Sequence, residues 1–132
     1  MFRIRHIDHV ALTVKDVERS VAWYHDVLGL ERRHQEVWGG VPAMMYAGET
    51  GIALFPATTE NPAPGPVHAN ATIMRHLAFH VDRANFLRAQ AELRGRGILV
   101  TFEDHQIAHS IYFHDPDGYE IELTTYELDA VA

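Results

Sequence analysis

The sequence predicts an α+β fold made of two similar modules, each consisting of a strand, a helix and three further strands. Segments with the alternating polarity of half-buried strands and segments with helical spacing follow one another in the same order twice. The two copies also carry a histidine at the same place, His9 and His76, which are 67 residues apart. Because one such sheet cannot cover both of its faces, a second copy would complete it.

The N-terminal module is expected at about residues 5–57. Residues 7–14 alternate in polarity and place His9 on the more polar face, as in a half-buried strand. Asp16 is positioned to cap a helix, and Gly29 is positioned to end it. Three strands are then expected at residues 30–38, 41–47 and 51–55.

A proline-rich linker is expected at about residues 58–72, because its prolines prevent regular strand pairing. The C-terminal module follows at about residues 73–126 and repeats the order of elements. Its first strand is expected at 74–81, its helix at 83–94, and its last strands at 98–103, 109–114 and 119–125. We expect the two modules to form a single domain of residues 1–132.

The composition excludes several functions. The chain has no cysteine, so disulfides, thiolate metal sites and a cysteine nucleophile are excluded. Its formal net charge of -7 argues against nucleic acid or an anionic membrane as a partner. No apolar run reaches the roughly 20 residues that a membrane span needs, and we expect a cytoplasmic protein. Ten histidines make imidazole the chief candidate metal ligand.

The repeat predicts a metal site. The offset of 67 that relates His9 to His76 carries Ala53 to within two residues of Glu122. Each histidine taken alone is more often a hydrogen-bonded core residue, but an inward carboxylate costs several kcal/mol unless a cation or proton neutralises it. Two imidazoles and one carboxylate form the ligand set of non-haem iron(II) sites, which manganese, nickel and zinc also use. We therefore expect one divalent ion, with iron(II) favoured, on His9, His76 and Glu122.

Four segments carry a resemblance to a known family. The strings DHVALTV, DVERSVAWYHDVLGL, HLAFHV and SIYFHDPDGYEIEL resemble the vicinal oxygen chelate superfamily, which contains glyoxalase I, extradiol dioxygenases, fosfomycin-inactivating enzymes and drug-binding resistance proteins. The resemblance covers nearly the whole chain. It implies paired βαβββ modules that form a metal-lined cup in a glyoxalase/dioxygenase-like fold, with ligands at His9, His76 and Glu122, and a homodimer. Closure of the cup within one chain or across the dimer is left open.

The resemblance favours one reaction in this family. The C-terminal sequence is similar to the extradiol dioxygenase pattern at His105, Tyr112 and Glu122 and at the Asp-Pro-Asp-Gly turn, although Glu103 departs from it. This implies an iron(II)-dependent dioxygenase, an oxidoreductase that cleaves a catechol, in which His105 and Tyr112 hydrogen-bond the substrate oxygens. The family also implies an acid/base histidine before the second ligand, for which His68 is the nearest candidate.

Alternative functions remain open. Glyoxalase relatives usually have a fourth ligand where this chain has Ala53, which argues against a glyoxalase or isomerase-like lyase. A fosfomycin-type resistance enzyme would need several basic side chains in the cup, and the chain has a single lysine, Lys15. A non-catalytic drug-binding protein would stack an aromatic ligand on Trp38, Tyr46 and Phe55. The substrate, the metal and the roles of His68, His80 and His109 are also left open.

Overall fold

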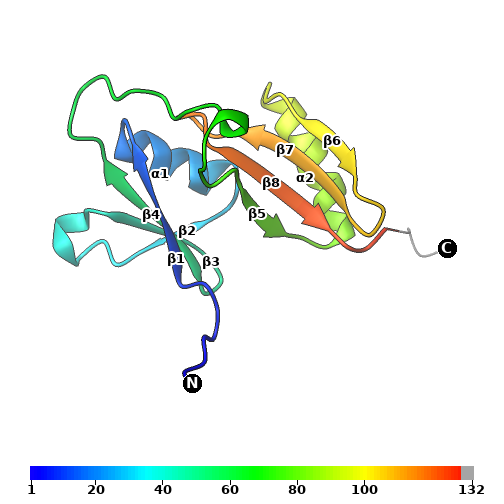
Figure 1. Cartoon of the computed structure of the whole chain (residues 1–132), viewed down its shortest axis with the longest axis horizontal. Coiled ribbons are helices and arrows are strands. Elements are labelled where there is room, and N and C mark those ends of the chain that lie inside the picture. The colour runs from blue at the N-terminus through cyan, green and yellow to red at the C-terminus, as the bar shows by residue number, and fades with distance from the viewer. Residues whose placement is uncertain (129–132) are drawn as a thin grey trace. The chain divides into compact units, whose positions relative to one another are not determined.

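The computed structural model describes residues 1–128 and consists of two compact units, Met1–Ala63 and Pro64–Ala132. Within the described residues, each unit contains one α-helix and one four-stranded sheet (Figure 1). The units correspond to the two expected modules, and their boundary falls inside the expected linker. The prediction of two βαβββ modules in an α+β fold is confirmed.

The N-terminal module has the strand order β1-β4-β3-β2, in which β1 and β4 are parallel and the other pairs antiparallel. Helix α1 packs against β3 and β4. The elements are β1 His9–Val14, α1 Val17–Asp26, β2 Glu31–Arg33, β3 Ala43–Ala47 and β4 Thr50–Pro56, with a 3₁₀ turn at Trp38–Gly40.

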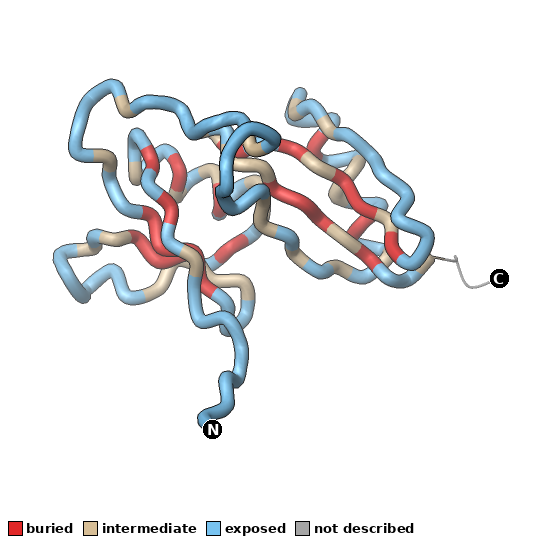
Figure 2. The backbone as a smooth tube through the Cα atoms, in the orientation of Figure 1, coloured by how far each residue is buried: buried red, intermediate tan, exposed pale blue. Residues whose placement is uncertain are grey.

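The expected signals at the ends of α1 act as predicted. The Asp16 carboxylate accepts a hydrogen bond of 3.0 Å from the Arg19 backbone N–H, which satisfies one of the free donors at the helix start. Gly29 adopts a φ of +69°, a conformation that costs a glycine little, and its N–H donates to the His25 carbonyl. Figure 2 shows the buried residues concentrated along the strands of the module.

The expected strand at 30–38 is wrong beyond Arg33. His34 and Trp38 both have positive φ values, of 65° and 55°, which are incompatible with an extended strand. The chain turns at these two residues and continues through the 3₁₀ turn. The turn carries the Trp38 side chain away from the strand and leaves it 60% exposed.

The C-terminal module repeats the topology with strand order β5-β8-β7-β6. Again the first and last strands are parallel and the other pairs antiparallel. Helix α2 packs against β8. The elements are β5 Leu77–His80, α2 Arg83–Gly95, β6 Thr101–Asp104, β7 His109–His114 and β8 Glu120–Thr125, preceded by a 3₁₀ turn at His68–Asn70.

Two strands of this module are shorter than expected. Strand β6 begins at Thr101 rather than at residue 98, because the backbone N–H of Ile98 donates to the Leu93 carbonyl and closes the end of α2. Gly97, with φ +74°, completes this closure by donating to the Arg94 carbonyl. Strand β5 covers four residues, so His76 directly precedes it.

The C-terminal sheet has one apolar and one polar face. Ile111, Phe113 and Ile121 are almost completely buried on the face that packs on α2, with Phe86 of the helix among them. The alternate residues of the same strands point to the opposite face.

No helix in residues 1–128 combines the length and the apolar character required to cross a membrane.

Candidate functional site

The strand registers relate the predicted ligand positions of the two modules. Ala11 lies opposite Ala53 in the N-terminal sheet, and Ala78 lies opposite Glu122 in the C-terminal sheet. The equivalent residues are thus 67 apart in the first strands and 69 apart in the last. Glu122 occupies the place that Ala53 has in the other module, as the repeat predicts.

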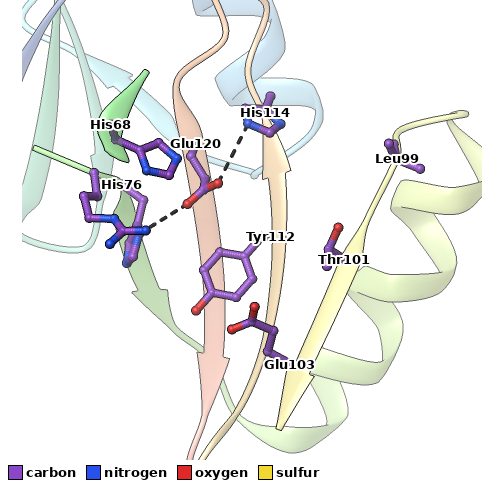
Figure 3. A pocket seen from close by; sticks show the side chains of 9 residues that line it. His68, His76, Leu99, Thr101, Glu103, Tyr112, His114 and Glu120 are labelled. Carbon is purple, nitrogen blue, oxygen red and sulfur yellow. Dashed lines mark ion pairs between the residues drawn. The ribbon is translucent and has the colours of Figure 1, made fainter. Parts of the chain in front are cut away.

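A row of side chains crosses the polar face of the C-terminal sheet. The registers place Thr101, Tyr112, Glu122 and Ala78 opposite one another on the four strands. A cavity of about 310 Å³ opens on this face (Figure 3). His68, His76, Glu103, Tyr112 and Glu120 are among the residues that line it.

His76 lies between two carboxylates in this module. Its Nε2 atom is 2.9 Å from Oε1 of Glu122, which is only 8% exposed, and its Nδ1 atom is 3.3 Å from Oε1 of Glu120. Figure 3 shows the contact with Glu120 as a dashed line. The two ring nitrogens face in different directions, so one ion can be bound by only one of them.

The spacing of Nε2 of His76 and Oε1 of Glu122 fits metal coordination. Two donor atoms that each lie about 2.1 Å from one ion, at about a right angle, are about 3 Å apart. The 2.9 Å between His76 Nε2 and Glu122 Oε1 agrees with that spacing. Neither module by itself, within residues 1–128, gathers three or more acidic or histidine side chains around one ion position. The third predicted ligand, His9, belongs to the N-terminal module.

Tyr112 and His105 lie together beside the His76 and Glu122 pair. The Tyr112 hydroxyl and Nε2 of His105 are 2.9 Å apart, in hydrogen-bonding contact. The Tyr112 ring meets the His76 ring edge-on, with 5.6 Å between centroids. His105 is held in a short turn after β6, where its backbone N–H donates to the Ala108 carbonyl. The structure thus brings four predicted site residues together in one module.

The environment of Tyr112 raises the pKa of its hydroxyl above the ordinary value of 10.0. Burial is the largest cause, followed by the negative charges of Glu122 and Glu103 and a hydrogen bond with the Glu122 side chain. The hydroxyl therefore stays protonated at neutral pH and is available as a hydrogen-bond donor.

The three histidines whose roles the sequence left open differ from one another in their surroundings. His68 lines the cavity, and its Nδ1 atom is buried without a hydrogen-bond partner among the described residues. The His80 ring contacts Tyr126 edge-on at a centroid distance of 5.7 Å, and Nε2 of His109 is 3.6 Å from an Asp104 carboxylate oxygen. Of these three histidines, only His68 lines the cavity.

His9 lines a hollow of the N-terminal module, of about 580 Å³. Its Nδ1 atom is 2.8 Å from Oδ2 of Asp8. It stands in a row with Gly51 and Tyr46, and a Cβ at Gly51 would come within 3.2 Å of the Tyr46 ring. The three aromatic residues expected to stack on a ligand, Trp38, Tyr46 and Phe55, all line this hollow, as do His34 and Ala53.

Sequence reasoning missed Asp8 and Glu120, the carboxylates beside the two predicted histidine ligands. Asp8 directly precedes His9, and Glu120 lies two residues before Glu122 on the same face of β8. The strand period would have indicated Glu120 as a neighbour of the site. Arg75, which lines the C-terminal cavity, had no comparable signal, because it precedes β5.

Comparison with known proteins establishes the family. The family model described as Glyoxalase/Bleomycin resistance protein/Dioxygenase superfamily matches residues 6–123, which cover nearly all of both modules. The chain belongs to this superfamily. The resemblance drawn from the four sequence segments is thereby confirmed, and so is the glyoxalase-like fold.

Members of the superfamily with different names resemble the chain to a similar degree. Glutathione transferase FosA of Serratia marcescens is 28% identical over 127 residues, which cover 96% of this chain and 85% of that protein. Catechol-2,3-dioxygenase of Bacillus subtilis is 28% identical over 120 residues, which cover 89% of this chain and 40% of that protein. A crystal structure of a glyoxalase/dioxygenase from Nostoc punctiforme, 27% identical, superposes with a TM-score of 0.75 over 92% of this chain and 90% of that chain.

Proposed function

We propose that the protein is a metal-dependent oxidoreductase of the superfamily, an extradiol-type dioxygenase that acts on a small catecholic compound. In this proposal His9, His76 and Glu122 hold one divalent ion, for which iron(II) is favoured. The observation that carries the proposal is the hydrogen bond between Tyr112 and His105, beside the His76 and Glu122 pair. That arrangement provides a donor and an acid/base group next to the expected metal ligands.

The ligands of the proposed ion come from both modules. The donor spacing of His76 and Glu122 supports two of them, and the matched position of His9 supports the third. When bound, a divalent ion polarises the oxygen atoms of a chelating substrate, and iron(II) adds the capacity for chemistry with dioxygen. Manganese(II), nickel(II) or zinc(II) would suit the same donors.

Tyr112 and His105 act on the substrate oxygens in this mechanism. Because its pKa is raised, the Tyr112 hydroxyl remains neutral and donates a hydrogen bond to a substrate oxygen that carries negative charge. His105, whose Nε2 atom is 2.9 Å from that hydroxyl, holds it in place and is the acid/base group that takes a proton from the substrate. The negative charge of Glu122 favours the protonated form of Tyr112.

The N-terminal hollow supports a substrate with an aromatic ring. Trp38, Tyr46 and Phe55 line the same hollow as His9. Aromatic side chains provide flat apolar surfaces that stack on a ring, while the polar end of the substrate remains near the imidazole. The same aromatic surfaces would serve the drug-binding alternative, which differs in requiring no metal.

A fosfomycin-type transferase is the second candidate. The similarity to glutathione transferase FosA favours it, and so does Arg75, a cationic side chain in the C-terminal cavity. A glyoxalase or isomerase-like lyase is a weaker candidate, because the buried methyl group of Ala53 cannot serve as a fourth metal ligand.

The test is anaerobic purification followed by elemental analysis and measurement of oxygen uptake with a panel of catechols. We expect about one iron per chain, catechol-dependent oxygen uptake and a coloured ring-fission product. Manganese, nickel or zinc without oxygen uptake would move the protein to the transferase or lyase alternatives. A protein that binds catechols but no metal would support the drug-binding alternative. Light scattering on the same preparation tests the expected homodimer.

A further inference from the structure

Each of the two predicted histidine ligands has a carboxylate at its Nδ1 atom. In the N-terminal module, Nδ1 of His9 is 2.8 Å from Oδ2 of Asp8. In the C-terminal module, Nδ1 of His76 is 3.3 Å from Oε1 of Glu120. The two carboxylates occupy different places in their modules, since Asp8 directly precedes β1 whereas Glu120 begins the neighbouring strand β8.

A carboxylate at Nδ1 determines how the opposite ring nitrogen can act. It accepts a hydrogen bond from Nδ1–H, which leaves the lone pair of the neutral imidazole on Nε2. It also holds the ring in one orientation and makes Nε2 a stronger electron donor. In His76 the Nε2 atom faces the predicted ligand Glu122, at 2.9 Å, so an ion bound by both residues would replace a proton between them.

We infer that Asp8 and Glu120 are positioning residues that prepare His9 and His76 to bind the metal ion through Nε2. The inference rests on the proposed function, because it assumes that the two histidines are ligands. Asp8 and Glu120 do not contact the ion themselves. They hold each imidazole in the required tautomer and orientation before the ion binds. Metal binding then does not have to supply the free energy that would otherwise be needed to fix the ring.

The surroundings of Glu120 show that it is built into the site. Its side chain is only 21% exposed, and its second oxygen, Oε2, lies 3.9 Å from Nε2 of His114. Figure 3 shows Glu120 between the rings of His76 and His114. Asp8 is more accessible, with a side chain that is 78% exposed, so its hydrogen bond to His9 is the weaker restraint. Removal of Glu120 should therefore have the larger effect.

The experiment measures the affinity of the full chain for Mn²⁺ by calorimetric titration. The variants Asp8→Ala and Glu120→Ala should bind Mn²⁺ about 10- to 100-fold more weakly than the parent protein. Asp8→Asn and Glu120→Gln keep a hydrogen-bond acceptor and should lose less affinity. Asp26→Ala is the matched control, since Asp26 accepts at Nδ1 of His25, at 3.0 Å, in a helix that carries no predicted ligand.

Nitrogen-15 NMR of the histidine rings in the metal-free protein gives a second readout. In the metal-free protein, Nδ1 of His9 and Nδ1 of His76 should each carry a proton, and Nε2 of His76 can carry a second proton toward Glu122. Each alanine variant should shift its own histidine toward the Nε2–H tautomer and leave the other unchanged. A protein that had merely lost stability would show no such selective change.

The outcomes separate this inference from the proposed function. Unchanged Mn²⁺ affinity in both alanine variants would overturn the positioning role and leave the ligand assignment intact. A His9 or His76 ring that carries no proton on Nδ1 in the parent protein would overturn the role for that histidine. If the parent protein binds no divalent ion, both the proposed function and the positioning role fail.

Discussion

At the residue scale, the C-terminal site depends on side chains that share one face of a sheet and are close enough to influence one another. Tyr112 and Glu122 are opposite each other on neighbouring strands, and Tyr112 reaches His105 with its hydroxyl. Burial, followed by the acidic groups on both sides of this tyrosine, raises its pKa. Its hydroxyl is therefore suited to donating a proton or a hydrogen bond and poorly suited to acting as a base.

Replacement of Tyr112 by phenylalanine tests this role. Tyr112→Phe removes the hydroxyl but leaves the predicted ligands, so metal content should be unchanged while kcat falls about 100-fold or more. Tyr126→Phe is the control, because Tyr126 is exposed and its ring contacts that of His80, which is not a predicted ligand. Metal analysis and steady-state kinetics on the same preparations provide the measurement. Unchanged kcat on the true substrate would remove Tyr112 from the mechanism.

The pKa of Tyr112 can be measured directly. Because its causes include the negative charge of Glu103, Glu103→Gln should lower the pKa of Tyr112 toward the ordinary value. The folded state binds this proton more tightly than the unfolded chain does, so stability is lost as pH rises from 10.0 through the folded pKa. Phenolate absorbance during an alkaline titration measures the shift, with Tyr112→Phe to assign the signal. A higher pKa in Glu103→Gln would contradict this account.

At the scale of the elements, the repeat is accurate in topology but the two copies differ in detail. The registers show two extra residues between the first and last strands of the C-terminal module. Both helices begin with an aspartate cap, Asp16 in α1 and Asp82 in α2. Both helices also end in a closure of two backbone hydrogen bonds around a glycine with positive φ, Gly29 after α1 and Gly97 after α2.

Two neighbouring glycines at the end of α2 should respond in opposite ways to alanine. Gly97 has φ +74°, so Gly97→Ala should destabilise the protein by about 1 to 2 kcal/mol. Gly95 is the last helical residue and has no such φ, so Gly95→Ala should stabilise by about 0.4 to 1 kcal/mol. A Cβ at either position would meet nothing within 4 Å, so side-chain packing should not contribute to the change in stability. Urea unfolding of both variants tests the contrast, and effects of the same sign would refute it.

At the scale of the whole molecule, the proposed metal links the stability of the fold to its ligands. An ion that binds only the folded protein should raise its stability by about 2.7 kcal/mol at a concentration of 100 times Kd. Addition of Mn²⁺ should therefore raise Tm, and a chelator should reverse the change. Neither should alter Tm in Glu122→Ala, in which a predicted ligand is absent. Full metal occupancy in this variant, or an equal Tm shift, would exclude Glu122 as a ligand.

Much of the fold could be predicted because the relevant signals are local. Strand alternation and helix caps depend on neighbouring residues, and they located β7 to the residue and the starts of both helices. The prediction failed at the strand that was expected to extend to Trp38. The positive φ values there belong to His34 and Trp38. Histidine and tryptophan, unlike glycine, do not indicate a turn in the sequence.

The sequence by itself determined the family, the order of the elements and the residue types available for a metal site. The family follows from the resemblance of four segments to known members, and the order of the elements and the residue types follow from periodicity, spacing and composition. All of these are properties of the chain before it folds. Only the tertiary structure decided that Tyr112 contacts His105. It also decided that Glu120 lies at Nδ1 of His76 and that Glu122 lies at Nε2 of the same ring. These contacts depend on which strands are neighbours and on where each long side chain comes to rest, and sequence spacing alone specifies neither.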